Sequence, residues 1–152
     1  ALAVIGNRRF GKSLNAEKAA LIGLYHDSTE ILTGDMPTPI KYYNPEIKKA
    51  FKDIEDTAAR NLISLLPEDM QADYLDIFFP NENEAYLHRL VKAADKLSAL
   101  IKCIEEAKTG NKEFTSAQAT LKQSIDEMHL EEADEFIKDF LPSYSLTLDE
   151  LR

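Results

Sequence analysis

The sequence contains a single cysteine and no long apolar run. Cys103 cannot form a disulfide within the chain, which is typical of proteins from a reducing compartment. No stretch is apolar enough to cross a bilayer, and no signal peptide is recognisable. These absences predict a soluble, cytoplasmic protein that uses no membrane partner.

Basic residues are also scarce. Lysine and arginine number 18 against 27 aspartates and glutamates, giving a net charge of −9 and a pI of about 4.8. This balance disfavours a protein that binds the phosphate backbone of DNA or RNA, because such binding requires a basic face. It does not exclude a small phosphorylated substrate, since a bound divalent cation can supply positive charge locally.

The hydrophobic pattern is helical almost throughout the 152 residues and predicts one all-α domain. Helices are expected from Asn15 to Gly34, from Pro45 to about residue 65, from Pro67 to Pro80, from about residue 85 to Gly110, and from about residue 117 to Pro142. Asn15 and Asn44 are expected to cap the first two of these helices. Residues 1–5 have the pattern of an apolar helix that begins ahead of them, and Gly6-Asn7 is interpreted as its stop. In the fourth helix the inward positions are expected to be Leu87, Val91, Ala94, Ser98 and Ile101. The acidic runs 53–56 and 131–135 are interpreted as solvated helix faces.

Three polar residues, His26, Asp27 and Glu30, stand close together inside the first of these long helices. Spacings of three and four residues place Glu30 near both others on the helix surface. A histidine with a carboxylate is a good ligand pair for a divalent metal. The alternative is that His26 is a hydrogen-bonded core histidine and Asp27 an ordinary helix residue.

Asp95 is expected to lie on a second helix, next to the apolar stripe. A buried aspartate needs a partner, because an unpaired buried carboxylate is costly. It could reach a metal near His26 and Asp27, or it could form a salt bridge with Arg60 or Arg89.

The segment 33–39 follows the metal-binding candidates directly and contains two prolines, which restrict its backbone. A stiff loop in that place is suited to positioning the polar groups of a substrate. The alternative is a helix-terminating turn in which Asp35 is merely solvated.

These features together resemble one family. A His-Asp pair, a glutamate three residues later, Gly-Asp-Met-Pro-Thr-Pro at 34–39 and a distant Ala-Asp at 94–95 are similar to the HD-domain phosphohydrolases, in the branch of YfbR-type 5′-deoxynucleotidases. The similarity covers essentially the whole chain, including the tail 141–150. The resemblance implies an HD-domain helical bundle over 1–152 that lacks its N-terminal helix or helices, because the family carries its first metal-ligand histidine on a helix ahead of Ala1.

The resemblance also implies roles for individual residues. His26, Asp27 and Asp95 would be metal ligands, and Glu30 would be the catalytic residue that handles the proton. The substrate-binding residues would be Asp27, Asp35, Met36, Pro37, Thr38 and Asp95.

The implied activity is hydrolysis of deoxynucleoside 5′-monophosphates to the nucleoside and phosphate by a homodimer. The implied cofactor is a divalent metal ion, with cobalt or manganese preferred over magnesium, zinc or iron. Two alternatives remain open: an HD phosphohydrolase for a signalling nucleotide or a deoxynucleoside triphosphate, and a non-catalytic helical interaction module.

Overall fold

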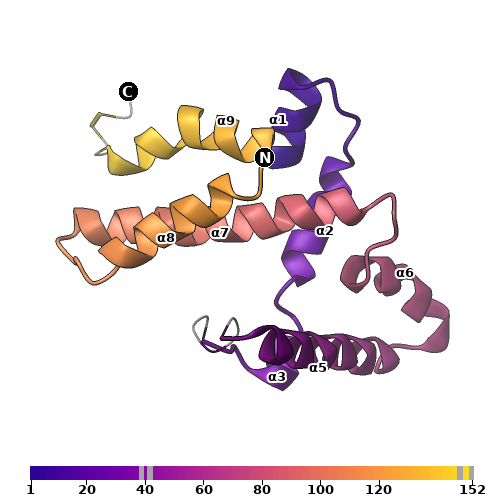
Figure 1. Ribbon diagram of the computed structural model, residues 1–152. Coiled ribbons are helices and arrows are strands. Elements are labelled where there is room, and N and C mark those ends of the chain that lie inside the picture. Colours follow the sequence, from indigo (N-terminus) through magenta and orange to yellow (C-terminus); the bar gives the residue numbers. More distant parts are fainter. Residues whose placement is uncertain (38–39, 41–42, 147–148, 151–152) are drawn as a thin grey trace. The chain divides into compact units, whose positions relative to one another are not determined.

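The computed structural model describes residues 1–37, 40, 43–146 and 149–150 of the protein. All regular elements within these ranges are helices (Figure 1), which confirms the all-α prediction. The chain divides into two compact units, one formed by residues 1–20 with 86–152 and the other by residues 21–85. The expectation of a single domain over 1–152 stays a prediction.

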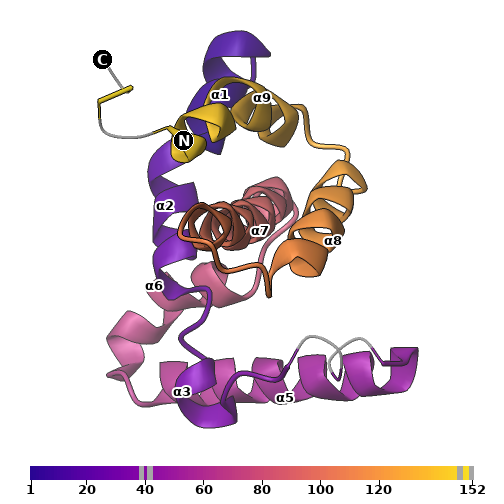
Figure 2. The same ribbon diagram turned by 90° about the vertical axis from the view of Figure 1, so that its left-hand side faces the viewer.

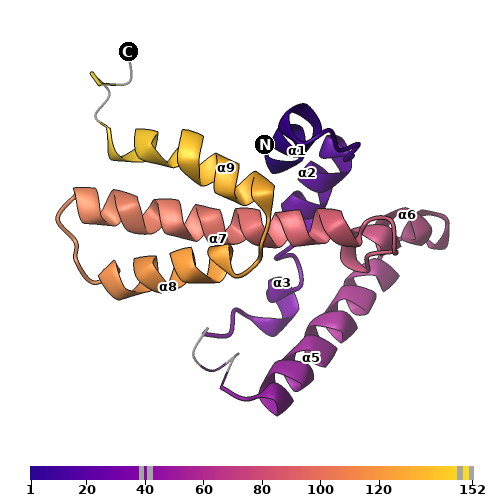
Figure 3. The same cartoon turned by 45° about the horizontal axis from the view of Figure 1, so that its top comes forward.

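The first unit is organised around the long helix α7 (Ala85–Lys108). Helices α8 (Thr115–Asp126) and α9 (Glu131–Asp139) run beside α7 (Figure 3), and α1 (Leu2–Arg9) contacts α9. A view along α7 shows α1 and α9 on one side of it and α8 on another (Figure 2). The short 3-10 helix η1 (Leu141–Ser145) follows and contacts α9. The buried core comprises Leu2, Ala3, Ile5, Leu90, Ala93, Leu97, Leu100, Ile125, Leu130 and Ala133.

The buried stripe of α7 differs from the predicted one. The buried residues are Leu87, Leu90, Ala93, Leu97, Leu100 and Cys103, whereas Ala94 and Ser98 are exposed. Both sets recur at intervals of three and four, so periodicity alone cannot choose between two neighbouring faces of one helix. The larger side chains decided the choice, because the stripe that is buried contains four leucines.

The predicted last helix is two helices. Helix α8 ends at Asp126, and α9 begins at Glu131 after His129, which has a φ of +50°, and Leu130, which is extended. A left-handed residue cannot continue a right-handed helix, so the chain turns there. The turn allows Leu130 to be buried in the core at an angle that a continuous helix would not permit.

A buried carboxylate joins three parts of the first unit. Glu132 is 0% exposed, which corrects the interpretation of this acidic run as wholly solvated. Its Oε1 accepts a hydrogen bond from Lys12 Nζ at 2.7 Å, and Tyr86 Oη lies 2.9 Å from its Oε2. Burial by itself lowers the pKa of Lys12, but hydrogen bonds to Glu131, Glu132 and Tyr86 outweigh it and hold this pKa above its ordinary value.

Gly6 makes room for the carboxylate instead of ending the helix. The expected stop at Gly6-Asn7 is wrong, because α1 continues to Arg9. A Cβ at Gly6 would lie 2.7 Å from Glu132 Oε1 and 2.8 Å from Leu14 Cδ1. The glycine is therefore required for the close approach of α9 to α1.

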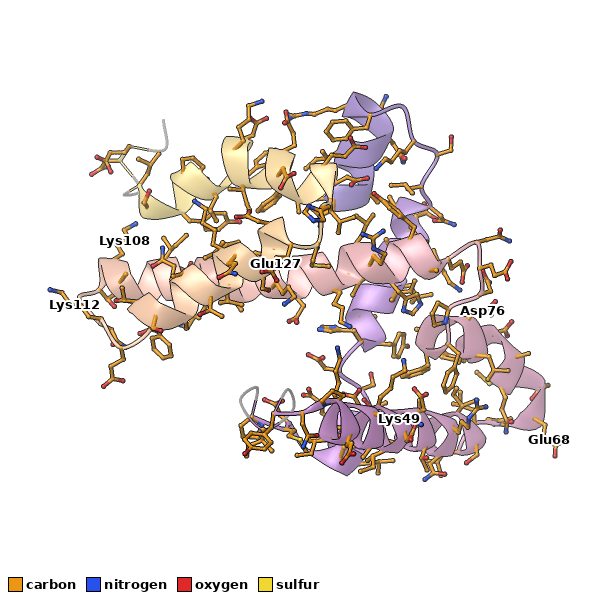
Figure 4. All side chains as sticks on the ribbon, viewed as in Figure 1. Lys49, Glu68, Asp76, Lys108, Lys112 and Glu127 are labelled. Atoms are coloured by element: carbon orange, nitrogen blue, oxygen red, sulfur yellow. The ribbon has the colours of Figure 1, made fainter. Side chains whose placement is uncertain are left out.

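The second unit contains the end of α2 (Ala16–Tyr25), α3 (Glu30–Thr33), α5 (Pro45–Ser64) and α6 (Glu68–Phe78). Asn44 caps α5, as predicted, and its Oδ1 accepts from Ile47 N at 2.7 Å. Helix α5 contacts both α3 and α6. Lys49, Glu68 and Asp76 are exposed on the surface of this unit (Figure 4).

Within the described ranges, no helix combines the length and the hydropathy that a bilayer span requires.

We expect Lys12→Met to lower the free energy of unfolding by about 3 kcal/mol, because it leaves the buried Glu132 carboxylate without its cation. Arg9→Met is the matched control, since Arg9 pairs with Glu135 and Asp139 at the surface of the same unit. Exposed pairs contribute little, so Arg9→Met should have a much smaller effect. Urea unfolding of both variants makes the comparison, and equal losses would contradict a special role for the buried pair.

Candidate active site

The turn that carries His26 and Asp27 begins where α2 ends. The prediction of one continuous helix from Asn15 to Gly34 is wrong, because α2 stops at Tyr25, residues 26–29 form a turn, and α3 begins at Glu30. In this turn the bonds run from Ser28 N to Tyr25 O and from Glu30 N to Asp27 O, each at 3.0 Å and three residues apart. Such bonds are tighter than those of an α-helix and redirect the chain.

The His26 ring contacts the last turn of α2. Its Nδ1 lies 2.6 Å from the carbonyl oxygen of Gly23. That carbonyl would otherwise accept the backbone N–H of residue 27 in a continued α-helix. A side chain thus competes for the acceptor that the next helical turn would use, and Gly23 itself lowers helix propensity.

His26 and Asp27 present their polar atoms to each other. Nε2 of His26 is 3.0 Å from Oδ2 of Asp27, and both side chains are exposed. Each ring nitrogen of His26 therefore faces an oxygen, and a neutral ring has only one N–H to donate. With one ring nitrogen directed at the Gly23 carbonyl, the other is directed at the Asp27 carboxylate.

This donor pair fits a divalent metal ion. Neighbouring donors on one ion with bonds of roughly 2.1 Å lie about 3 Å apart, which is the separation of Nε2 and Oδ2 here. The hydrogen bond from Nδ1 to a backbone carbonyl is the arrangement that orients a metal-binding histidine. Among the described residues, neither unit by itself gathers three or more His, Cys, Asp or Glu side chains into a metal-binding group.

Glu30 follows directly from the turn. It is the first residue of α3, it is half-buried, and its backbone N–H donates to the Asp27 carbonyl. The turn thus fixes the backbone of Glu30 against that of Asp27.

The loop after α3 starts at Gly34, whose φ of +68° and ψ of +170° belong to a region that essentially only glycine adopts. Asp35 and Pro37 are exposed and Met36 is half-buried. Thr38, the remaining predicted substrate contact of this loop, lies outside the described residues.

An aromatic cluster holds the end of α2, and the sequence interpretation missed it. The ring of Tyr25 meets that of Tyr74 edge-on, with centroids 5.8 Å apart and planes at 89°, and the Phe78 ring lies 6.3 Å away. The pKa of Tyr74 is raised, first by the charge interaction with Tyr25 and then by a hydrogen bond to it. Tyr74 and Phe78 are one helical turn apart on α6, a spacing that equally well describes ordinary core residues.

Asp95 lies in the first unit, on α7, and it is exposed. The prediction of a buried aspartate is wrong because the buried stripe runs through Ala93 and Leu97, and a residue two positions from each lies on the opposite side of the helix. Its proposed roles as metal ligand and substrate contact stay predictions. Of the two arginines considered as partners, Arg60 lies over the Phe79 ring and Arg89 donates to the Met128 carbonyl.

A groove of about 380 Å³ lies between α3 and α5. Its lining comprises Leu32, Asp53, Ile54, Thr57, Ala58 and Asn61. The charged member of this lining is an aspartate, so the groove does not suit an anionic phosphate group.

Comparison with known proteins finds similarity to 5′-deoxynucleotidases over nearly the whole chain. A family model described as 5′-deoxynucleotidase YfbR-like matches residues 1–144. A 5′-deoxynucleotidase of Pectobacterium atrosepticum is 50% identical over 154 residues, covering 99% of this chain and 76% of the relative. One from Vibrio cholerae is 46% identical over 151 residues, covering 99% and 78%. One from Yersinia pestis is 47% identical over 154 residues, covering 99% and 77%.

We expect Gly34→Ala to lower the free energy of unfolding by about 1–3 kcal/mol, because alanine is strained at this backbone conformation. Gly23→Ala is the matched substitution in the same unit. Gly23 lies inside α2 with nothing within 4 Å of an added Cβ, so alanine should stabilise the helix by about 0.5–1 kcal/mol. In chemical unfolding, Gly34→Ala should lower the free energy of unfolding and Gly23→Ala should raise it. A decrease in both variants would contradict the backbone conformations assigned to the two glycines.

Proposed function

Because the chain belongs to the YfbR-like 5′-deoxynucleotidase family, we propose that it hydrolyses deoxynucleoside 5′-monophosphates to the deoxynucleoside and phosphate. The observation that carries this proposal is the family match over residues 1–144. The relatives are named for the same activity and align with 99% of the chain. The protein is accordingly a phosphoric monoester hydrolase.

His26 and Asp27 are the proposed metal ligands of the second unit. The 3.0 Å separation of their donor atoms supports this assignment, as does the backbone carbonyl that orients the His26 ring. A divalent ion, preferably cobalt or manganese, would withdraw charge from phosphorus and acidify a bound water when present. Asp27 is also proposed to contact the substrate.

Glu30 is the proposed acid–base residue. Its carboxylate accepts a proton from the water whose oxygen forms the new bond to phosphorus. The bond from phosphorus to the 5′ oxygen breaks, and the Glu30 carboxyl returns the proton to that oxygen. The backbone hydrogen bond from Glu30 N–H to the Asp27 carbonyl supports this role, because it fixes the backbone of Glu30 against that of a proposed ligand.

The loop after α3 is the proposed nucleotide contact. Asp35 and Pro37 are exposed directly after Gly34, and they are accessible to a sugar or a base. A loop that starts from a single glycine conformation and contains a proline loses little freedom when a substrate binds. Such a loop suits selection among small polar ligands.

We also propose that the protein is a cytoplasmic homodimer. Four large apolar side chains of the second unit, those of Leu24, Ile31, Tyr43 and Leu65, are 74–79% exposed. Exposed side chains of this size are apolar surface that a second copy of the chain could cover. The single, buried and unpaired Cys103 supports a reducing compartment.

The substrate is tested with protein expressed from its complete gene. We expect phosphate release from deoxynucleoside 5′-monophosphates with cobalt or manganese, loss of release with a chelator, and little release from ribonucleotides or triphosphates. Release only from triphosphates or from a signalling nucleotide would keep the hydrolase and change its substrate. No release from any nucleotide with any metal would favour a non-catalytic helical module.

The two roles in the turn are separated by two substitutions. Glu30→Gln should reduce turnover about 100-fold or more and leave cobalt binding intact, because it removes only the proton acceptor. Asp27→Asn should weaken both cobalt binding and turnover. Glu46→Gln, at an exposed glutamate in the first turn of α5, is the control and should change neither. Calorimetric titration with cobalt and a phosphate-release assay measure the two properties, and full activity in Glu30→Gln would remove Glu30 from its role.

A further inference from the structure

Tyr25 connects α6 with the turn that carries His26 and Asp27. Its ring packs on Tyr74 and Phe78 of α6, at centroid distances of 5.8 Å and 6.3 Å. Its carbonyl oxygen accepts the backbone N–H of Ser28 at 3.0 Å, the bond that closes the turn after α2. One residue thus takes part in both the aromatic cluster and the turn.

The direction of His26 depends on the direction of Tyr25. Successive side chains of an α-helix point about 100° apart around its axis, so fixing one ring fixes the rotation of the helix end. The Tyr25 ring is held by two rings on another helix, whereas His26 is exposed. The hydrogen bond from the His26 ring to the Gly23 carbonyl fixes the ring relative to α2. It does not fix α2 relative to α6.

We propose that Tyr25 is a positioning residue, whose ring, packed against Tyr74 and Phe78, sets the direction in which His26 and Asp27 present their donor atoms. The proposal rests on the proposed function in taking these atoms as metal donors. Tyr25 itself touches no reacting group, and it acts through the turn. The edge-on contact at 89° restricts rotation of the ring, which a flexible aliphatic residue at position 25 would not do.

The sharpest substitution is on α6, because it leaves every residue of the turn unchanged. Tyr74→Leu removes the ring that meets Tyr25 edge-on. Tyr74→Phe keeps the ring and removes the hydroxyl that hydrogen-bonds to Tyr25, so its effect should be smaller than that of Tyr74→Leu. Phe140→Leu is the matched control, since it disrupts another aromatic pair, Phe136–Phe140 at 5.3 Å, in the first unit.

The first measurement needs neither metal nor substrate. The three histidines, at positions 26, 88 and 129, give separate ring carbon–proton signals in NMR spectra of the metal-free protein. In Tyr74→Leu we expect the His26 signal to shift or broaden while that of His129 stays in place. An unchanged His26 signal in folded Tyr74→Leu would overturn the proposal.

The second measurement is cobalt affinity by calorimetric titration. Residues that orient metal ligands typically alter affinity 10–100-fold, so Tyr74→Leu should weaken binding about 10-fold or more. Phe140→Leu should bind cobalt as the wild type does, and Tyr74→Phe should lose less affinity than Tyr74→Leu. Equal weakening by Tyr74→Leu and Phe140→Leu would reduce Tyr25 to a general contributor to stability and overturn the proposal.

Two further outcomes are distinguishable. If Tyr74→Leu does not fold, Phe78→Leu tests the same contact through the more distant ring, with the same expected results. If the wild type neither binds cobalt nor hydrolyses nucleotides, the proposed function fails, and the NMR measurement still decides whether Tyr25 positions His26.

Discussion

The contact between the His26 ring and the Gly23 carbonyl is the interaction on which the candidate site depends. It ties the ring to the last turn of α2, which ends at Tyr25. The same contact leaves Nε2 facing Asp27, at 3.0 Å. Because α3 starts from this turn, the placement of Glu30 and of the loop from Gly34 follows from it. A helix that continued through residue 26 would distribute these side chains differently around its axis.

A second constraint, the buried carboxylate of Glu132, organises the other unit. It requires a cation, supplied by Lys12, and a hydroxyl, supplied by Tyr86, and it requires a residue without a side chain at position 6. A buried charge is costly unless it is paired, so these contacts specify how α1, α7 and α9 meet. The two units thus differ in kind: buried ionic contacts join the helices of one, and aromatic rings link α2 to α6 in the other.

The placement of the donor pair on a turn has a chemical consequence. Exposed donors at a helix end can be approached by a ligand as bulky as a nucleotide, whereas the same residues inside a long helix would need a cleft beside it. Residues in such a turn are more mobile than residues in a helix, because a turn has fewer backbone hydrogen bonds. Packing of Tyr25 against α6 limits this mobility without covering His26, which is exposed.

The sequence by itself determined the helical class, the caps at Asn15 and Asn44, the family and the identity of the candidate residues, because these depend on local propensity and on motifs. Tertiary structure decided which face of α7 is buried, since two neighbouring stripes share the same spacing and only packing of the leucines separates them. It also explains why a glycine stands at position 6 inside α1. A side chain there would collide with the Glu132 carboxylate, which is 126 residues away in the chain. Contacts between distant residues leave no periodic trace in a sequence, and for that reason Glu132 and the Tyr25 cluster emerged only from the fold.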